Sequence, residues 1–396
     1  MNRIDSTTTA PGPDLARAQS LALTVGAAAL VLSVIGWFVN PDQFFRSYLT
    51  GYLFWLGVAL GSLPLLLLQY LTGGAWGLAI RRFLEASVRT LPFMALLFVP
   101  IVLGMHSLYE WTHADAVAAD EVLRHKAAYL NRPFWCVRAV AYFAVWIGLT
   151  WRVTEWSREQ DRTGEIELAR KMQILSGPGI VFYFLAITFA GVDWVMSLDP
   201  HWVSSIFAPL IAVGQVLNAF SFSILLLALL AGYPPFAGVV QPSVFHDLGK
   251  LLLAFIMVWA YFSFSQFLII WAGNLPEEIR WYLKHYEGGW FALGIFIVVF
   301  HFFVPFFLLL SRDLKRNMRR LAGVAAFIMV MRFIDIFWTV TPLFHPEHLA
   351  VHWIDLTALA GIGGIWLWLF LRELSSQPLL PVRDPYLEEA FAHAEH

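Results

Sequence analysis

The sequence contains a single cysteine, Cys136, among its 396 residues. One cysteine cannot form a disulfide framework or a four-cysteine metal cluster, and it excludes the Cys-x-x-Cys-His attachment of a c-type haem. No covalently bound cofactor is therefore expected. Any redox chemistry would need a partner or a diffusible molecule to carry the electrons.

Charged residues are also scarce: they make up 14% of the chain, against about 25% in soluble domains. Hydrophobic residues make up 59%, and the mean hydropathy is +0.65. A soluble core could not bury so much apolar surface, so we predict a polytopic membrane protein. The sequence carries no phosphate loop, nucleophile elbow or zinc-protease helix. Its net charge is −2, and nucleic acid is excluded as a partner.

Long apolar runs dominate the chain. A helix needs about 20 apolar residues to cross ~30 Å of hydrocarbon. Ten such runs occur, at about 16–39, 48–72, 88–110, 133–154, 174–198, 204–232, 248–273, 289–311, 319–341 and 350–373. They are continuously apolar rather than alternating, which favours helices over barrel strands. We predict an all-α fold with a membrane domain at 16–373, between a tail at 1–15 and another at 374–396.

The distribution of Lys and Arg predicts the orientation, since short cytoplasmic loops carry the excess. Of the 26 basic residues, 18 fall on the side of the two termini and 6 on the opposite side, while Arg138 and Arg332 lie within spans. Both termini are therefore expected in the cytoplasm. The cluster from Arg312 to Arg320 reads as a topology anchor, with acidic lipid or a partner as the alternative.

Two aspartates lie in the outer halves of apolar spans, and each precedes a proline by seven residues: Asp193 before Pro200 and Asp335 before Pro342. A carboxylate at membrane depth costs ~2.5–3.5 kcal/mol on the insertion scale. Finding the same feature twice, in the same local frame, predicts a duplicated unit with an internal polar site.

Aligning the two aspartates places the fifth span on the ninth. The alignment predicts two four-helix bundles, at about 48–198 and 204–341, flanked by the first and last spans. Both copies run in the same direction, so the repeat is parallel rather than inverted. Close helix packing is expected at Gly57-x-x-x-Gly61 and at Ala360-x-x-x-Gly364.

Each aspartate needs a partner. Arg332 stands three residues before Asp335, hence on the same helical face. Asp193 has no cation at helical spacing, so Arg138 of the fourth span is the expected partner. Two interpretations stay open for each acid: a structural ion pair, or a group that exchanges protons.

His301 lies near the middle of the eighth span, where an imidazole can relay protons or donate a hydrogen bond to a quinone carbonyl. A satisfied interhelical hydrogen bond is the plainer alternative. A b-type haem usually needs two deep histidines, and only His301 is deep. His345 and His348 lie in an outer loop without a helical frame, so no metal site is predicted.

Polar residues also gather at the span ends. Arg81, Glu85 and Arg89 run at helical spacing into the third span, and Lys250 lies near the start of the seventh. Such groups can form a water-accessible vestibule for proton uptake, or they simply cap helix ends. The full hypothesis for a proton path contains Asp193, Asp335, Arg332, His301, Arg138, Glu85 and Lys250. On the outer side, His106, Tyr109, Glu110, Glu277 and Glu278 are candidates for a proton exit or a docking surface.

Three stretches carry a family resemblance: GYLFWLGVALGSLPLLLLQYLTGGAWGLAIRR (Gly51 to Arg82), LGKLLLAFIMVWAYFSFSQFLIIWAGNLPEEIRWYL (Leu248 to Leu283) and the following Gly288, Gly289 and Trp290. They resemble the polysulfide-reductase-like (NrfD-like) family of membrane subunits, in particular the second such subunit, the ActF type, of alternative complex III. That complex is a bacterial quinol:cytochrome c oxidoreductase. The Gly-Asn-Leu-Pro-Glu-Glu run starting at Gly273 is the most distinctive piece.

The resemblance implies a set of partners. These are multihaem and monohaem cytochrome c subunits, an iron-sulfur subunit, a sister NrfD-like subunit that carries the main quinol site, and in some assemblies a cytochrome c oxidase. It also implies a role as scaffold and proton path rather than as the catalytic subunit. No motif in this chain fixes a quinone.

We therefore expect a non-catalytic subunit of a quinol-oxidising electron-transfer complex. A secondary transporter with a midplane site near Asp193 and Asp335 is the main alternative. Against it stand the parallel repeat and the lack of helix-breaking Gly/Pro pairs at matching midspan positions. A quinol-binding membrane anchor of a periplasmic molybdoenzyme is a third possibility.

Overall fold

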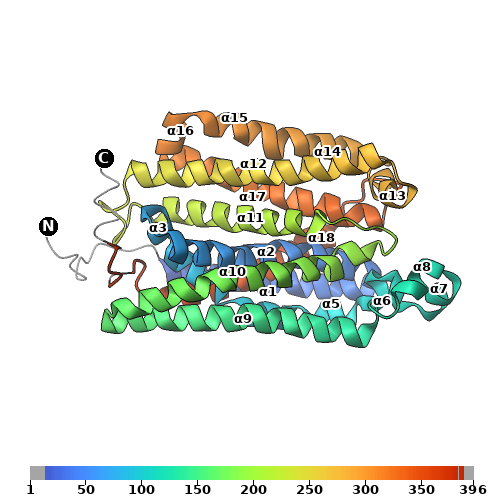
Figure 1. Ribbon diagram of the computed structural model, residues 1–396, viewed down its shortest axis with the longest axis horizontal. Coiled ribbons are helices and arrows are strands. Elements are labelled where there is room, and N and C mark those ends of the chain that lie inside the picture. The colour runs from blue at the N-terminus through green and yellow to red at the C-terminus, as the bar shows by residue number, and fades with distance from the viewer. Residues whose placement is uncertain (1–13, 382, 388–396) are drawn as a thin grey trace.

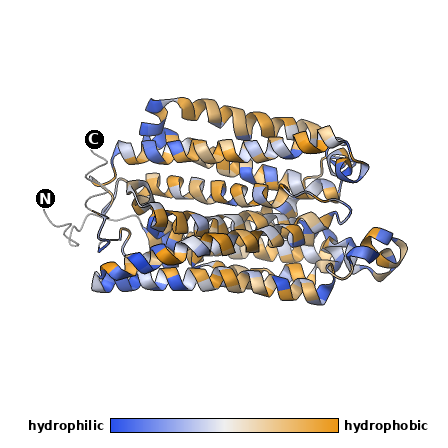
Figure 2. Ribbon diagram, viewed as in Figure 1, coloured by the Kyte–Doolittle hydropathy of each residue, from blue (hydrophilic) through white to orange (hydrophobic). Residues whose placement is uncertain are grey.

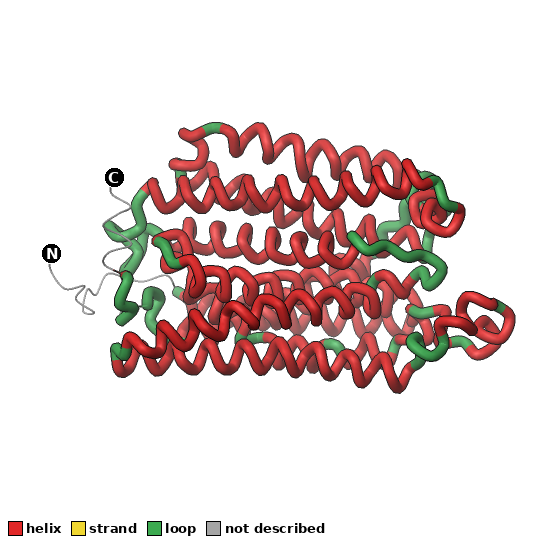
Figure 3. The backbone as a smooth tube through the Cα atoms, in the orientation of Figure 1, coloured by secondary structure: helices red, strands yellow, loops and turns green. Residues whose placement is uncertain are grey.

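The computed structural model describes residues 14–381 and 383–387. Most of the tail predicted at 1–15, and the last nine residues of the tail predicted at 374–396, lie outside this part. Within the described residues the chain is helical and contains no strand (Figure 3). Ten helices or helical segments are long and apolar enough to cross a membrane. The prediction of an all-α polytopic membrane protein is confirmed.

The helices follow one another with short connections. In chain order they are α1 (Leu15–Val39), α2 (Pro41–Thr72), α3 (Ala75–Val88), α4 (Leu91–Leu97), α5 (Val99–Leu103), α6 (Met105–Leu108), η1 (Glu110–Thr112), α7 (Ala114–Ala119), α8 (Glu121–Lys126), α9 (Arg132–Thr163), α10 (Ile166–Trp194), η2 (Met196–Leu198), α11 (Phe207–Leu230), α12 (Pro242–Gly273), α13 (Pro276–Lys284), α14 (Trp290–Ile297), η3 (Val298–Phe303), α15 (Val304–Leu310), α16 (Arg312–Arg316), α17 (Met318–Val340), η4 (Thr341–Leu343) and α18 (Trp353–Ser375).

Local chemistry explains where several helices begin and end. The side chains of Asn40, Asn131 and Asn317 accept hydrogen bonds from the first turns of α2, α9 and α17, which satisfies donors that a helix start leaves unpaired. Gly164, with φ at 75°, ends α9 in the left-handed conformation that favours glycine. The loop between α9 and α10 is therefore very short, and the charged stretch around it is helical on both sides.

The helices pack as two groups. In the first group, α2 packs on α3 and α10, and α9 packs on α10; in the second, α11 packs on α12 and α17, and α14 packs on α17. The two groups meet along α2 and α11 (Figure 1). The first and last spans, α1 and α18, pack on each other, and α18 also lies along α2.

Glycines allow two of these contacts to be close. A Cβ placed on Gly61 of α2 would lie 2.1 Å from the backbone oxygen of Gln215 on α11. A Cβ on Gly364 of α18 would lie 2.4 Å from the Cα of Gly26 on α1. Close packing is thus found at one residue of each motif, Gly61 and Gly364, whereas Ala360 is exposed and Gly57 makes only ordinary contacts.

Apolar residues cover the length of the bundle, and hydrophilic residues concentrate at its two ends (Figure 2). We call the end where α1 begins and α18 stops the terminal end, and the other the opposite end. Two spans are interrupted: the third is split by Pro92 and Pro100 into α3, α4 and α5, and the eighth contains the π-helical turn η3. The predicted repeat does not align the third span with the eighth, so the two interruptions are not equivalent.

Candidate functional site

The first of the two buried carboxylates, Asp193, lies in the last turn of α10 and has no exposed surface. Arg138 of α9 donates two hydrogen bonds to it, from Nε to Oδ2 at 2.7 Å and from Nη2 to Oδ1 at 2.8 Å. The hydroxyl of Tyr142, one turn further along α9, donates to Oδ2 at 2.7 Å. The pairing of Asp193 with Arg138 is as predicted.

Arg138 also contacts groups other than Asp193. Its Nη1 donates to the carbonyl of Tyr129 at 2.9 Å, and its guanidinium lies 3.8 Å and 4.4 Å from the ring centroids of Tyr129 and Phe134. Bidentate charge-assisted pairs are strong and geometrically specific. Asp193 and Arg138 each bond to more than one group, so the pair holds α9 against α10. This geometry favours the structural interpretation of Asp193.

The second carboxylate, Asp335 on α17, pairs with Arg332 one turn earlier on the same helix. The guanidinium of Arg332 lies against Gly214 of α11, where an added Cβ would stand 2.2 Å from Nη2. Only glycine leaves room for the charged group at this point. Among the described residues, Arg332 Nε has no hydrogen-bond partner.

His301 lies beside this pair, fully buried, on the π-helical turn η3 of the eighth span. Pro305 lacks the N–H that would bond to the His301 carbonyl in an α-helix, which explains why the backbone loosens here. The imidazole lies with its centroid 4.1 Å from that of Trp259 on α12. A positive charge on this imidazole would be repelled by the guanidinium of Arg332.

Neither ring nitrogen of His301 has a hydrogen-bond partner within the described part of the chain, and the indole of Trp259 lies within reach of the Asp335 carboxylate. We call His301, Trp259, Arg332 and Asp335 the His301 cluster. It is assembled from η3, α12 and α17 in the second helix group.

A stripe on α11 extends this polar region. Gly214, Asn218 and Ser221 share one face of the helix by their spacing. Asn218 donates to the carbonyl of Phe54 on α2 at 3.2 Å. The side-chain oxygens of Asn218 and Ser221, and that of the neighbouring Gln215, find no partner among the described residues. Polar atoms with unused hydrogen-bonding capacity thus continue along α11 toward the terminal end.

Such atoms are rare in protein interiors, where buried polar groups are nearly always hydrogen-bonded. Water fills this role where the protein does not. An imidazole with two free nitrogens can accept a proton on one and release it from the other. The imidazole of His301 can therefore exchange protons beside the Arg332–Asp335 pair.

Comparison with known proteins adds no assignment at this point. No protein-family model matches the chain, and a search of curated proteins finds no match. Within the described residues, no group of three His, Cys, Asp or Glu side chains gathers in a way that could hold a metal ion.

The expected vestibule at the terminal end needs correction. Glu85 is fully buried rather than water-accessible. Its carboxylate accepts hydrogen bonds from Arg81 Nε at 3.0 Å, Arg82 Nη1 at 2.5 Å and the Ser157 hydroxyl at 2.7 Å. Sequence could not show this burial, because it depends on α9 and on the C-terminal segment, whose Asp384 also pairs with Arg81.

Lys250 lies apart from Glu85, on the exposed start of α12, and its ammonium pairs with Asp247 at 3.0 Å. The seven residues of the proton-path hypothesis thus fall into four places: the Asp193 pair, the His301 cluster, the buried Glu85 network and the surface at Lys250. Asp335, Arg332 and His301 come together in one site, and Asp193 and Arg138 come together in another.

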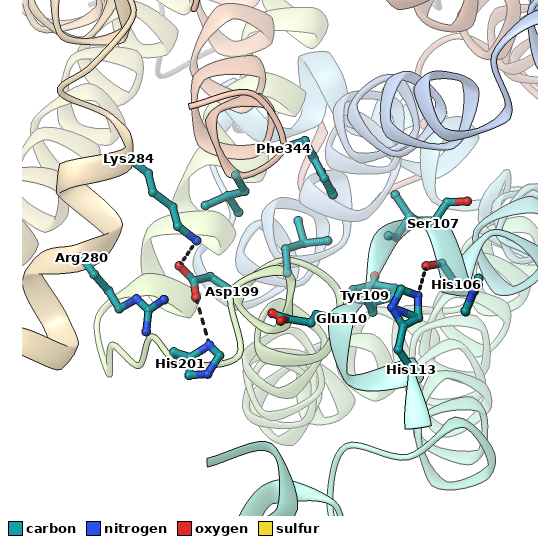
Figure 4. A pocket seen from close by; sticks show the side chains of 13 residues that line it. His106, Ser107, Tyr109, Glu110, His113, Asp199, His201, Arg280, Lys284 and Phe344 are labelled. Atoms are coloured by element: carbon teal, nitrogen blue, oxygen red, sulfur yellow. Dashed lines mark hydrogen bonds and ion pairs between the residues drawn. The ribbon is translucent and has the colours of Figure 1, made fainter. Parts of the chain in front are cut away.

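At the opposite end, a cavity of about 230 Å³ lies between the two helix groups (Figure 4). It includes His106, Tyr109 and Glu110 of the expected outer surface, together with His201 and Lys284. Asp199, almost fully buried, accepts a hydrogen bond from Lys284 Nζ at 2.8 Å. Glu277 and Glu278 do not line this cavity.

A further buried acid, Asp355 of α18, was not anticipated. It accepts hydrogen bonds from the Ser47 hydroxyl at 2.5 Å and from Gln43 of α2 at 3.5 Å. Gln43 in turn lies 3.3 Å from His345. An acid two residues after Trp353 at a helix start looks like a simple cap in sequence, and Asp355 does accept from the His352 backbone N–H. Its second role depends on α2 and was not visible.

Proposed function

We propose that this chain is an integral membrane subunit of a quinol:cytochrome c oxidoreductase of the alternative complex III type. In this role it is a scaffold beside the quinol-oxidising subunit and carries a proton path through its second helix group. Its membrane is the inner membrane of a bacterium, with both termini in the cytoplasm. Multihaem and monohaem cytochrome c subunits, an iron-sulfur subunit and the sister NrfD-like subunit are its partners.

One observation carries the proton path: His301 is fully buried in the interior of an apolar bundle, and neither of its ring nitrogens has a partner among the residues that the structure describes. An ionisable side chain at this depth is costly and marks a functional site by default. The neighbouring Arg332–Asp335 pair supplies a carboxylate one helix away. The π-helical turn that carries His301 adds support, since such turns are frequent at functional sites.

The subunit role rests on the sequence resemblance of the segments at 51–82 and 248–283. The chain alone offers no covalent cofactor attachment, so electrons would pass through its partners. A redox change in the neighbouring subunit would drive protons through the His301 cluster.

The test is made on the complex purified from its native membrane. Asp335→Asn keeps the shape of the side chain and removes its charge. We expect the assembled complex to retain its cytochromes and quinol oxidation, while the number of protons translocated per quinol falls. Asp115→Asn, on the exposed helix α7, is the matched control and should change neither. A chain that purifies and functions alone, without cytochromes, contradicts the subunit proposal.

A secondary transporter remains the second candidate, because the eighth span is interrupted at mid-depth beside a polar cluster. Discontinuous helices of this kind form substrate sites in transporters. Substrate-dependent uptake into liposomes that contain only this chain would favour it. A lone catalytic subunit and ferredoxin-like protein copurifying with the chain would instead favour the molybdoenzyme anchor.

A further inference from the structure

The second helix group carries an unusual lysine at the terminal end. Lys315, on the short helix α16, exposes only 8% of its surface. Its side chain has no hydrogen bond or ion pair with any residue that the structure describes. Lysine is almost never buried unless it is paired, so the burial of this unpaired lysine is unusual.

The position of Lys315 is built into the packing of two helices. Its aliphatic stem crosses α12 at Gly249, where an added Cβ would lie 2.6 Å from Lys315 Cγ. Any larger residue at 249 would displace the stem. The amine is not among the fully buried atoms, so the stem packs against protein while the charged head reaches the surface.

Other cations surround the Lys315 ammonium. His246 is within electrostatic range of Lys250, Lys315 and Arg312. Burial, together with the nearby Lys250 ammonium, lowers the pKa of Lys315. The acids on these elements are Asp247, which already pairs with Lys250, and Asp313. Positive charge is therefore in excess, and it lies beside the first turns of the 32-residue helix α12, whose N-terminal dipole also favours an anion.

We propose that Lys315, Lys250 and Arg312 form a binding site for the phosphate of an anionic phospholipid, with Gly249 providing the seat that fixes Lys315. The occupant is a lipid rather than a soluble anion because apolar, exposed side chains continue directly from the site. Phe307 and Leu310, in the last turns of α15, are 63% and 54% exposed and can receive the acyl chains. Clusters of basic residues at the end of a membrane span are typical of anionic-lipid recognition.

The test uses the full-length protein in nanodiscs, with phosphatidylglycerol or phosphatidylcholine as the added lipid. Retained lipid is counted by native mass spectrometry. We expect wild type to retain phosphatidylglycerol preferentially. Lys315→Met, which keeps the stem and removes the charge, should weaken this binding about fivefold, because each basic residue near the surface contributes about 1 kcal/mol. Gly249→Ala should weaken it similarly, and Lys315→Arg should restore part of it.

Lys171→Met is the matched control. Lys171 is an exposed lysine near the terminal end of α10, in the first helix group, and its loss should leave retention unchanged. Equal losses for Lys171→Met and Lys315→Met would mean diffuse attraction and would overturn the site. Equal retention of the two lipids would also overturn the site, and so would displacement of phosphatidylglycerol by millimolar inorganic phosphate. If lipid retention is unchanged by Lys315→Met, and the same variant loses a copurifying protein when isolated from its native membrane, the surface belongs to a protein partner and the lipid site is overturned.

Discussion

Asp193 in the first helix group and Asp335 in the second have the same spacing to a following proline, yet their surroundings differ. Asp193 receives three hydrogen bonds from two side chains of a neighbouring helix and has no exposed surface. Asp335 pairs with an arginine of its own helix, and its side chain is 14% exposed. Polar atoms without protein partners lie around the second acid, at Arg332 and His301.

The difference depends on which helix supplies the arginine. An arginine on another helix joins two helices and uses both carboxylate oxygens, as Arg138 does. An arginine one turn away on the same helix neutralises the acid without tying it to a neighbour, as Arg332 does. The same sequence feature can therefore serve as a lock in one bundle and stay available for chemistry in the other. The following experiments test this contrast.

The largest effect is expected for Asp193→Asn. Removing one partner of a buried pair leaves Arg138 uncompensated and costs about 3–5 kcal/mol. We expect a large fall in the thermal unfolding midpoint of the purified protein and little assembled complex. The double variant Asp193→Asn/Arg138→Gln should recover part of the loss. An Asp193→Asn protein that assembles normally but no longer moves protons would reverse the assignment of the two sites.

Tyr142→Phe tests the same lock with a smaller change. It removes one hydrogen bond to a charged group, which contributes about 1.5–3 kcal/mol. Tyr183→Phe is the matched control, because the hydroxyl of Tyr183, a fully buried tyrosine of α10, has no hydrogen-bond partner among the described residues. Thermal unfolding should show a clear loss for the first variant and a smaller one for the second. Equal losses would show that the hydroxyl of Tyr142 contributes nothing special to the lock.

Acid should destabilise the second helix group through His285. Burial lowers the pKa of this histidine to about 4 from its usual 6.5, so the unfolded chain takes up the proton first. Stability is unaffected above pH ~6.5 and is lost as the pH falls toward 4, by about 2 kcal/mol at pH 5. Unfolding midpoints measured at pH 7 and 5 should show this loss in wild type.

His285→Phe keeps a ring next to Trp281 and Trp338 and should reduce this acid sensitivity. His348→Phe, in the outer loop, should leave it unchanged. If wild type and His285→Phe lose stability equally, His285 is not the acid-sensitive group. The comparison also separates acid instability from any pH dependence of proton transfer at the His301 cluster.

The smallest effect on stability is expected for His301→Phe. The variant keeps an aromatic ring against Trp259 and removes two nitrogens that lack protein partners, each of which costs about 1–3 kcal/mol when unmet. Stability should stay within about 1 kcal/mol of wild type, or rise, while protons translocated per quinol fall. A loss of more than about 2 kcal/mol with normal proton transfer would make His301 structural.

Short-range features were predictable from sequence. Ten apolar runs gave the ten spans, and the spacing of Arg332 and Asp335 gave their pairing. Arg138 could be named as the partner of Asp193 because few cations lie inside the spans. The prediction of the third span was less accurate. The span begins at Ala75, but the prediction placed its start near residue 88 because Arg81, Arg82 and Glu85 lower the hydropathy of its first half.

That error shows the limit of hydropathy. These charged residues lie within a span because the two arginines pair with Glu85 and with Asp161 and Asp384 from other parts of the chain. The ring contact of His301 with Trp259 and the hydrogen bond of Ser47 to Asp355 likewise join residues far apart in the chain. None of these contacts has a sequence signal, since each depends on how helices turn toward one another.

The sequence by itself determined that this chain is an all-helical membrane protein, because burial in lipid is decided residue by residue from apolar content and backbone hydrogen bonding. Only the tertiary structure decided which charges are satisfied. A carboxylate has the same local sequence whether its partner comes from its own helix or another, and the packing of α9 on α10 and of α11 on α17 made the difference. That packing fixed Asp193 as a lock and left His301 with free nitrogens.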